Sequence, residues 1–432
     1  MTPAARVEAA IEVLAELAAR PRPAADTLKD WGLSHRFAGS GDRAAIAGLV
    51  YDALRRRASA AFVMGEESPR AIVLGTLRLA RGLDLEAVAK LCSGERHAPA
   101  PLSETERAKL ANANLSEAPA AVAGDYPEWL DPYLTETFGE ERAAEGAALA
   151  ARAPLDLRVN TLKTTAEKAA AALDHLRAKP ARWSPVGLRI LLTAEGRQPP
   201  LTSEPGFKKG WFEIQDEGSQ LAALLSGAAA GEQMLDLCAG SGGKTLALAA
   251  LMDNRGQLFA HDDDPRRLAP IHDRLKRSGA RNVQVRSPRG EADVLADLVG
   301  KMDRVLIDAP CTGTGVWRRH PDAKWRMRPG ALEIRIKEQA ALLDQATRFV
   351  KPGGKIAYVT CSVLEAENGA QVRAFLARTP GWAVVAVAEV ALALGARGEL
   401  LRAAALVTAE GMLLTPRRTE TDGFYISLLA RR

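Results

Sequence analysis

The first third of the chain places apolar residues at the spacing of amphipathic helices. From Ala4 to Ala19 they recur every three or four positions, and the stretch from Asp42 to Arg57 does the same. Prolines at positions 21 and 23 end the first of these helices, and no alternating strand pattern occurs before position 145. We therefore predict a separate helical domain over residues 1–145, with its boundary near residues 151–154.

From residue 150 to about 230 the pattern changes to short alternating runs and two helical runs. Strands are predicted at Leu155–Asn160, Gly187–Leu192 and Gly210–Gln215, and helices at Thr165–Ala178 and Asp216–Leu225. This mixture indicates a small α+β segment over residues 150–230, which we expect to help bind the substrate.

From Gly231 onward strands and helices alternate regularly. The predicted strands are Met234–Leu237, Gln257–Ala260, Val283–Val285, Arg304–Ile307, Ile356–Val359 and Gly423–Leu428. The predicted helices are Lys244–Met252, Pro265–Ser278, Leu332–Val350 and Ala366–Ala377. This order predicts an α/β fold, a doubly wound, Rossmann-like parallel sheet over residues 231–432. Ligands of such sheets bind beyond the carboxyl ends of the strands, where the motifs described below occur.

The composition of the chain excludes several classes of protein. Its 432 residues carry a net charge of +5, a mild excess that permits a polyanionic partner without requiring one. The four cysteines are Cys92, Cys238, Cys311 and Cys361. They have neither the spacing of zinc ligands nor the density of a disulfide scaffold, so we expect reduced thiols and no metal. The chain has no basic start followed by an apolar run, as a secretory signal would have, and no stretch of about 18 apolar residues that could span a membrane. We therefore expect a cytoplasmic protein with no membrane partner. We also expect a monomer.

A glycine-rich turn lies between a predicted strand and a predicted helix, from Asp236 to Thr245. A phosphate-binding loop is one reading, because the turn ends in Gly-Lys-Thr, but that motif needs a glycine where Cys238 stands. The other reading is a loop for S-adenosylmethionine, Asp-x-Gly-x-Gly-x-Gly in loose form, in which Cys238 replaces the first glycine. Glycines in such a turn let the backbone approach a ligand closely. The residues expected to line it are Cys238, Ala239, Gly240, Ser241, Gly242, Gly243 and Lys244.

Three aspartates follow the next predicted strand. Asp262 stands about 20 residues beyond the turn, where an acidic residue holds the ribose hydroxyls in the analogous dinucleotide folds. Alternatively, the aspartates at 262–264 cap the helix that begins at Pro265, and different aspartates can fill the two roles. We expect Asp262 and Arg267 to contact the cofactor.

Two cysteines stand at predicted strand ends, Cys311 after Asp308-Ala309-Pro310 and Cys361 between Thr360 and Ser362. A thiolate that adds to carbon 6 of cytosine makes carbon 5 nucleophilic enough to take a methyl group, and the thiol is later eliminated. A carboxyl group near the ring, for which Asp308 is the candidate, stabilises the charge that develops. The alternative is that each cysteine simply packs in the core. The chemistry alone does not decide which cysteine attacks.

A basic segment follows Cys311 closely, from Trp317 to Arg328. It contains five Lys or Arg residues against one Asp, with two tryptophans. Such a segment suits an RNA backbone and an unstacked base, whereas the alternative is a solvated loop that its tryptophans anchor to the core. The residues expected to contact RNA here are Arg318, Arg319, His320 and Lys324.

Taken in order, these motifs resemble those of the RNA cytosine-5 methyltransferases of the Sun (Fmu, RsmB-like) group. The resemblance covers residues from about 158 to 428. Besides the cofactor turn, it rests on Arg158-Val159-Asn160-Thr161-Leu162-Lys163, Gln215-Asp216-Glu217-Gly218-Ser219-Gln220, Asp308-Ala309-Pro310-Cys311, Arg318-Arg319-His320-Pro321-Asp322, Thr360-Cys361-Ser362, Glu367-Asn368 and Asp422-Gly423-Phe424.

The resemblance implies roles that the residues alone leave open. Cys361 would be the nucleophile, Cys311 would assist proton removal and release, and Asp308 would contact both the base and the methionine end of the cofactor. Arg158 and Asn160 would belong to the substrate-binding residues. The helical domain resembles the NusB-like RNA-binding domain of members that act on 16S rRNA, so we expect RNA, and 16S rRNA in particular, as the partner.

Two other functions stay open, the same reaction on tRNA and a non-catalytic RNA-binding assembly factor on a methyltransferase scaffold. The chain also departs from the family pattern, with Gly240-Ser241 in place of Ala-Pro in the turn. The aspartate expected near the adenine after the third strand is missing, and Ser287 or Asp293 are the candidates to replace it.

Overall fold

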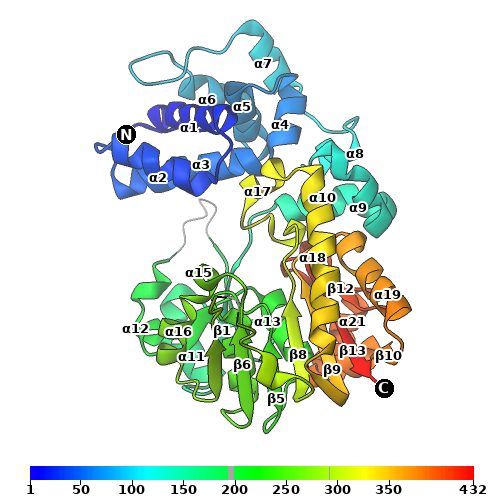
Figure 1. Cartoon of the computed structure of the whole chain (residues 1–432). Coiled ribbons are helices and arrows are strands. Elements are labelled where there is room, and N and C mark those ends of the chain that lie inside the picture. Colours follow the sequence, from blue (N-terminus) through cyan, green and yellow to red (C-terminus); the bar gives the residue numbers. More distant parts are fainter. Residues whose placement is uncertain (193–198, 291) are drawn as a thin grey trace. The chain divides into compact units, whose positions relative to one another are not determined.

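The computed structural model describes residues 1–192, 199–290 and 292–432 and divides into two compact units (Figure 1). The helical unit consists of Met1–Ala153 together with the distant segment Trp317–Arg328. The α/β unit contains Pro154–Leu191, most of the chain up to Val316, and Pro329–Arg432. The sequence pattern did not predict that the basic segment belongs to the helical unit.

The helical unit is built from amphipathic helices. They are α1 (Pro3–Ala19), α2 (Ala24–Ser34), α3 (Ser40–Arg55), α4 (Arg57–Met64), α5 (Pro69–Leu79), α6 (Leu85–Leu91), α7 (Glu104–Ala111), α8 (Ala120–Ala123), α9 (Asp131–Phe138), α10 (Arg142–Ala150) and α17 (Pro321–Arg326). Thr2 caps α1 by accepting a hydrogen bond from the Ala5 amide, and Pro3 takes the first helical position, where its missing N–H costs nothing. Ile46 and Val50, four residues apart on α3, are fully buried in the core, as the helical spacing requires.

A small antiparallel sheet opens the α/β unit, with the strand order β2-β3-β1-β4. Its strands are β1 (Leu155–Val159), β2 (Lys179–Pro180), β3 (Gly187–Ile190) and β4 (Phe212–Ile214), accompanied by α11 (Ala166–Ala172) and α12 (Pro205–Lys208). The three predicted strands are present, each shortened by one to three residues at its ends.

The large sheet has nine strands in the order β11-β12-β13-β9-β8-β5-β6-β7, with β10 beside β13. The strands are β5 (Gln233–Asp236), β6 (Gln257–His261), β7 (Val283–Arg286), β8 (Met302–Asp308), β9 (Val350–Thr360), β10 (Trp382–Val384), β11 (Leu406–Val407), β12 (Met412–Leu414) and β13 (Phe424–Arg431). Strands β5 to β9 are parallel, which confirms the predicted doubly wound fold. The sheet is nevertheless mixed, because β13 runs antiparallel to β9 and carries further antiparallel strands.

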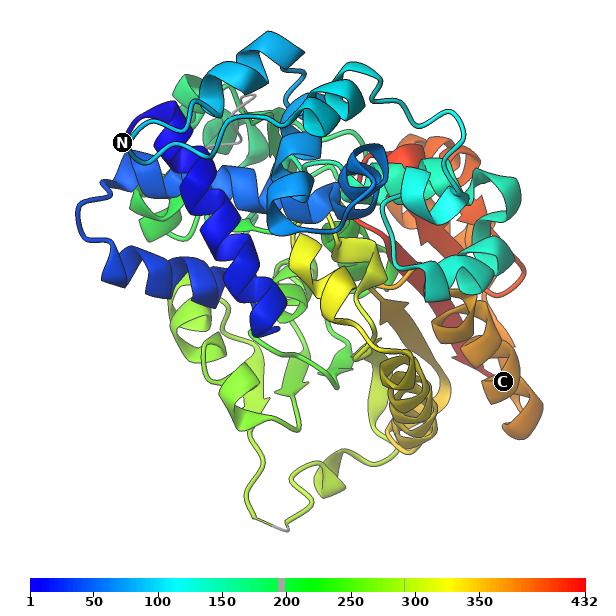
Figure 2. The ribbon, with the colours of Figure 1, turned by 90° about the horizontal axis from the view of Figure 1, so that it is seen from above.

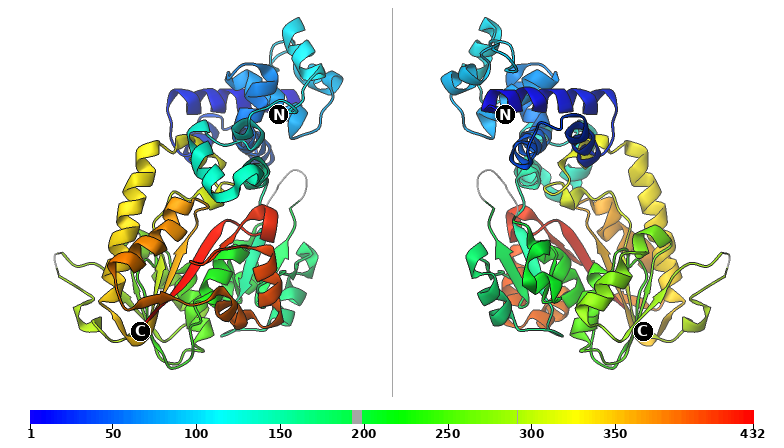
Figure 3. Two further views of the ribbon diagram at one scale, coloured as in Figure 1. Left: turned by 90° about the vertical axis from the view of Figure 1, so that its right-hand side faces the viewer. Right: turned by 90° about the vertical axis from the view of Figure 1, so that its left-hand side faces the viewer.

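Helices cover both faces of this sheet. They are α13 (Glu217–Leu225), α14 (Gly243–Leu251), α15 (Pro265–Leu268), α16 (Ile271–Ser278), α18 (Pro329–Thr347), α19 (Gly369–Arg378), α20 (Val387–Ala391), α21 (Ala396–Ala404) and α22 (Pro416–Thr419). Figure 2 looks nearly along α18 and shows it beside the strands, and both views of Figure 3 place it on one side of the sheet. No helix in the described ranges combines the length and the apolar character that crossing a membrane requires.

Several predicted helices have other ends than predicted, and the one expected over Thr165–Ala178 already ends at Ala172. The helix expected over Pro265–Ser278 is broken between α15 and α16 at Pro270, whose ring removes an N–H and clashes with the preceding turn. The helix expected to reach Val350 ends at Thr347, because Val350 is fully buried and pairs with Met302 as the first residue of β9.

The strand order reverses at one point of the sheet. The chain enters the parallel part of the sheet at β5, proceeds outward to β6 and β7, and then returns to add β8 and β9 on the other side of β5. The order therefore reverses between β5 and β8, and ligands of open α/β sheets bind beyond the carboxyl ends of strands at such a point. The glycine-rich turn follows β5, and Asp308 ends β8, so both lie at this edge.

Candidate active site

The glycine-rich turn between β5 and α14 has a conformation that glycine favours. Gly240 and Gly242 have φ values of 50° and 84°, in the left-handed region. A Cβ atom at Gly242 would also lie 2.5 Å from Cγ1 of Ile271, so no side chain fits there. The turn begins at Asp236, a fully buried carboxylate that accepts a 2.7 Å hydrogen bond from the Thr245 hydroxyl.

The carboxyl group of Asp236 is buried with few hydrogen bonds, which raises its pKa. Its Oδ1 is buried without a hydrogen-bond partner among the described residues. Burial, opposed by the Thr245 hydrogen bond and helped by the nearby Asp308 carboxylate, raises the pKa of this carboxyl group to about 7. Burial likewise raises the pKa of the neighbouring Cys238 thiol well above its usual value, which keeps this thiol neutral.

Two of the three aspartates after β6 make different contacts. Asp264 caps α15 by accepting a 2.9 Å hydrogen bond from the amide of Arg266. Asp262 instead faces the glycine-rich turn, where its Oδ2 accepts from the Gly240 amide at 2.9 Å. The guanidinium of Arg267 lies 3.6 Å from the same oxygen, so both residues predicted beside the cofactor lie against the turn.

An ion pair joins the turn to the end of β8. Lys244, in the first turn of α14, places its Nζ 2.7 Å from Oδ2 of Asp308. The Lys244 side chain is 8% exposed and that of Asp308 is 34% exposed, so the pair is shielded on the lysine side only. The ammonium also lies 5.1 Å from the centre of the Phe424 ring, a cation–π distance that further fixes its position.

The two predicted cysteines lie side by side. β8 and β9 are parallel neighbours in which Asp308 is opposite Val359, so the residues that follow each strand emerge together. The sulfur atoms of Cys311 and Cys361 are 3.3 Å apart, and both residues are only partly buried. The hydrogen bond with Cys361, together with burial, raises the pKa of the Cys311 thiol well above its usual value. Cys311 therefore keeps its proton beside the sulfur of Cys361.

Buried polar residues that sequence reasoning had given no role hold the two cysteine loops together. Glu367 accepts hydrogen bonds from the Thr312 amide at 2.8 Å and from the Gln339 side chain at 3.0 Å. Asn368 accepts from the Thr360 hydroxyl at 2.6 Å and donates to the carbonyl of Ser362 at 3.0 Å. The signal in the sequence was the Glu-Asn pair a few residues after Cys361, a polar pair that the fold buries.

Arg158 and Asn160, predicted to bind the substrate, are buried and support the scaffold instead. Arg158 donates from Nε to the Gln215 side chain at 2.6 Å and reaches the Gly243 carbonyl at 3.5 Å. Asn160 donates to the carbonyls of Gly210 and Ser278, both at 2.8 Å. Each of the two residues is only 3% exposed. Because a buried side chain offers little surface to a substrate, we do not propose substrate-binding roles for them.

The basic segment does not behave as a solvated loop. Lys324 is 1% exposed, and its ammonium donates to the carbonyls of Arg55 and Asp125 at 3.0 and 2.5 Å. The Trp325 indole donates to the Leu54 carbonyl at 2.6 Å. This placement corrects the prediction that Lys324 contacts RNA, because an ammonium buried on two carbonyls anchors its segment and cannot reach a phosphate.

The other predicted RNA contacts in this segment differ in exposure. Arg318 is also buried, at 4% exposure, and its carbonyl accepts a 2.8 Å hydrogen bond from Arg55. Arg319 is partly exposed and His320 is exposed. We keep Arg319 and His320 as the candidates for RNA contact.

The buried position of Lys324 predicts a pH-dependent stability. Burial lowers the pKa of Lys324 from 10.5 to about 7, while the Asp125 carboxylate opposes the shift and the Arg55 and Arg56 guanidinium groups add to it. Between these two values the unfolded chain binds the proton and the folded chain does not, so the free energy of unfolding rises with pH, by at most about 1.4 kcal/mol per pH unit.

Urea unfolding at pH 7 and pH 9 should show this rise in the wild type and a smaller rise in Lys324→Met. Lys29→Met, an exposed lysine of the same unit, should keep the wild-type slope, and equal slopes in all three proteins would contradict the assignment.

Comparisons with known proteins show the family of the chain. A sequence family described as 16S rRNA methyltransferase RsmB/F matches residues 223–430, and the ferredoxin-like domain of RsmF/B-like methyltransferases matches residues 126–195. A probable ribosomal RNA small subunit methyltransferase B of Synechocystis is 31% identical over 310 residues, which span 70% of this chain and 67% of the relative. The chain belongs to the RsmB/F family of 16S rRNA methyltransferases.

A second relative matches a shorter stretch. The ribosomal RNA small subunit methyltransferase B of Citrobacter koseri is 36% identical over 259 residues, 59% of this chain and 58% of that protein. Among solved structures, PH0851 covers 99% of both chains with a TM-score of 0.71 and 24% identity, which shows a shared fold. NSun6 from Pyrococcus horikoshii, solved with SFG, covers 71% of this chain and 98% of its own with a TM-score of 0.60 and 22% identity.

Proposed function

We propose that this protein methylates carbon 5 of a cytosine in small-subunit ribosomal RNA, with S-adenosylmethionine as methyl donor and Cys361 as nucleophile. The observation that carries the proposal is the pair of sulfur atoms 3.3 Å apart at the ends of β8 and β9. A methyltransferase that acts on a more nucleophilic atom has no need of a thiol, whereas carbon 5 of cytosine does. The names of the RsmB/F relatives support ribosomal RNA as the substrate.

The residues around the glycine-rich turn fit S-adenosylmethionine. The turn has no side chain at Gly240 or Gly242, so backbone atoms can contact a ligand directly. Asp262 offers a carboxylate to ribose hydroxyls, and the Lys244–Asp308 pair offers both charges to the amino and carboxylate groups of the methionine end. When bound, the cofactor supplies a methyl group on a positively charged sulfur.

The reaction then depends on what the two cysteines and Asp308 do to the base. The Cys361 thiolate forms a bond to carbon 6, and the electron pair displaced onto the ring makes carbon 5 nucleophilic. Asp308 is the carboxyl group assigned to the ring nitrogen and amino group, where charge develops. Once carbon 5 is methylated, a water molecule takes its proton to solvent, the electron pair left on carbon 5 restores the double bond to carbon 6, and the bond to Cys361 breaks with its electron pair on the departing sulfur. Cys311, whose sulfur lies beside the leaving sulfur and carries a proton, assists this release.

The proposal is tested by identifying the product. The full chain is incubated with unmodified 16S rRNA transcribed in vitro and methyl-labelled S-adenosylmethionine, and the RNA is digested to nucleosides for mass spectrometry. We expect the label in 5-methylcytidine, at one position that bisulfite sequencing then locates. Unmodified tRNA serves as the parallel substrate. Label in another nucleoside, or in tRNA only, would contradict the proposal.

A further inference from the structure

Two sequence motifs without a role in the proposed chemistry meet in the structure. Asp216, the residue before α13, caps that helix by accepting a 2.7 Å hydrogen bond from the Gly218 amide. The same carboxylate accepts from the amide of Asp422, 206 positions along the chain, with both oxygens at 3.2 Å. The motif around Asp216 is thus bonded to the motif that begins at Asp422.

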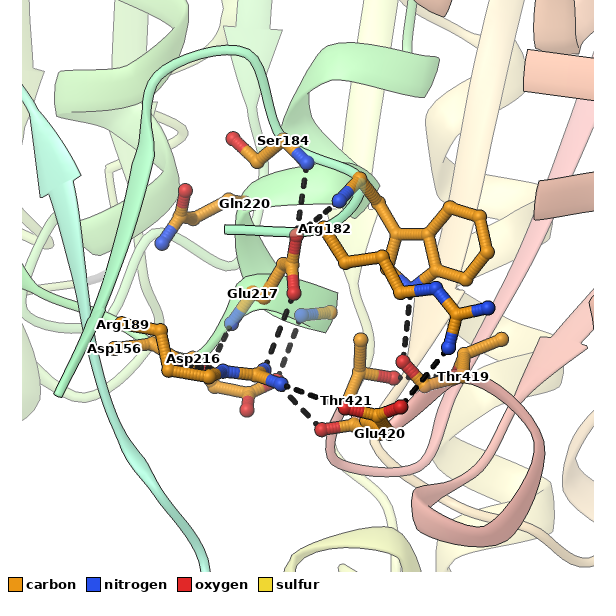
Figure 4. A network of polar contacts seen from close by, with 12 residues as sticks. Asp156, Arg182, Ser184, Arg189, Asp216, Glu217, Gln220, Thr419, Glu420 and Thr421 are labelled. Atoms are coloured by element: carbon orange, nitrogen blue, oxygen red, sulfur yellow. Dashed lines mark hydrogen bonds and ion pairs between the residues drawn. The ribbon is translucent and has the colours of Figure 1, made fainter. Parts of the chain in front are cut away.

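The turn before Asp422 is fastened from a second side (Figure 4). Arg189 of β3 donates to Asp156 at 2.7 Å, to Glu217 at 3.1 Å and to the carbonyl of Glu420 at 3.2 Å. The Trp183 indole donates to the Thr419 carbonyl at 2.8 Å. Asp156 and Glu217 are buried, so these charge-assisted hydrogen bonds hold the turn in one place.

From Asp422 the contacts continue to the nucleophile. The Gly423 amide donates to the Gly315 carbonyl at 2.8 Å, and the Gly315 amide donates to the carbonyl of Cys361 at 2.9 Å. The backbones of the two glycines are packed so closely that a Cβ atom at Gly315 would lie 2.2 Å from the Gly423 oxygen. The next residue, Phe424, lies under the ammonium of Lys244.

We propose that Asp216 is a positioning residue for the two-cysteine site. It fixes the peptide at Asp422 and Gly423, which fixes Gly315 and through it the backbone of Cys361. This inference rests on the proposed function in one respect, that the sulfur of Cys361 is the nucleophile. A displacement of about 1 Å at a reacting group can cost roughly 100-fold in rate, so a carboxylate that touches neither RNA nor cofactor can still control turnover.

The test compares Asp216→Ala and Asp216→Asn in the full chain. The alanine variant removes both acceptors, and we expect kcat to fall about tenfold or more with little change in KM for RNA or in S-adenosylmethionine affinity. The asparagine variant keeps one oxygen for the Gly218 amide and should recover part of the rate. Asp84→Ala is the matched control, because Asp84 caps α6 in the helical unit by accepting from Ala87 at 2.8 Å. Its kcat should equal that of the wild type.

A second measurement does not depend on methylation. The cysteines are alkylated with iodoacetamide, and each peptide is quantified by mass spectrometry. We expect the rate at Cys361 relative to Cys238 to change about threefold in Asp216→Ala and to stay at the wild-type value in Asp84→Ala, because thiol reactivity follows the local surroundings.

The outcomes separate the two proposals. If the wild type forms 5-methylcytidine while Asp216→Ala keeps its kcat and its alkylation pattern, the positioning role is wrong. If the wild type forms no 5-methylcytidine, the proposed function fails, and the alkylation rates alone decide whether Asp216 positions Cys361. If the alanine variant does not fold, Asp216→Asn decides by the same two measurements, and wild-type values in both would overturn the inference.

Discussion

Replacing Cys361 by alanine is expected to abolish methyl transfer, with a fall in rate of roughly 1,000-fold or more. Without the sulfur no bond forms to carbon 6, and carbon 5 stays too weak a nucleophile to take the methyl group. S-adenosylmethionine affinity should be unchanged, because the turn after β5 and the Lys244–Asp308 pair remain. Incorporation of labelled methyl groups into 16S rRNA measures the rate, and calorimetry measures the affinity.

Cys92→Ala is the control for loss of a thiol. Cys92 lies in the core of the helical unit, 2% exposed, so its replacement should leave kcat at the wild-type value. Methyl transfer by Cys361→Ala at the wild-type rate would exclude Cys361 as the nucleophile.

Replacing Cys311 by alanine is expected to trap the enzyme on its RNA. Cys361 can still attack the base, but the protonated sulfur 3.3 Å away that assists its departure is missing. A covalent RNA–protein complex should therefore accumulate toward one RNA per protein, visible as a slow band on a denaturing gel. The double variant lacking both cysteines should give no such band. A band from Cys361→Ala in place of Cys311→Ala would reverse the two roles.

The parts of the fold and site that the sequence predicted are those with local signals. Alternating and helical spacing placed the parallel strands, and the Asp-x-Cys-x-Gly-x-Gly run placed the turn after β5. Cys311 and Cys361 were predicted to share an edge because each follows the carboxyl end of a predicted strand of the parallel sheet. The antiparallel strands β10 to β12 were missed because they have two or three residues each, too few to show a period.

The errors concern contacts between residues far apart in the chain. Lys324 looks like a surface charge, since lysine is rarely buried, and its acceptors on Arg55 and Asp125 are 269 and 199 positions away. Arg158 and Asn160 were assigned to the substrate through the family resemblance, which does not reveal whether the fold covers their side chains. The bond from Asp422 to Asp216 was hidden for the same reason.

The segment Trp317–Arg328 belongs to the helical unit although the chain on either side of it belongs to the other unit. This limits where the chain can be cut to obtain one unit alone. A chain shortened by its first 153 residues would keep Lys324 and Trp325. It would lose the carbonyls of Arg55, Asp125 and Leu54, which accept the hydrogen bonds of these two side chains. The Lys324 ammonium and the Trp325 indole would then be left without their hydrogen-bond acceptors, inviting aggregation. A soluble catalytic fragment calls for a second excision, with a short flexible bridge from Val316 to Pro329 in place of the twelve residues removed.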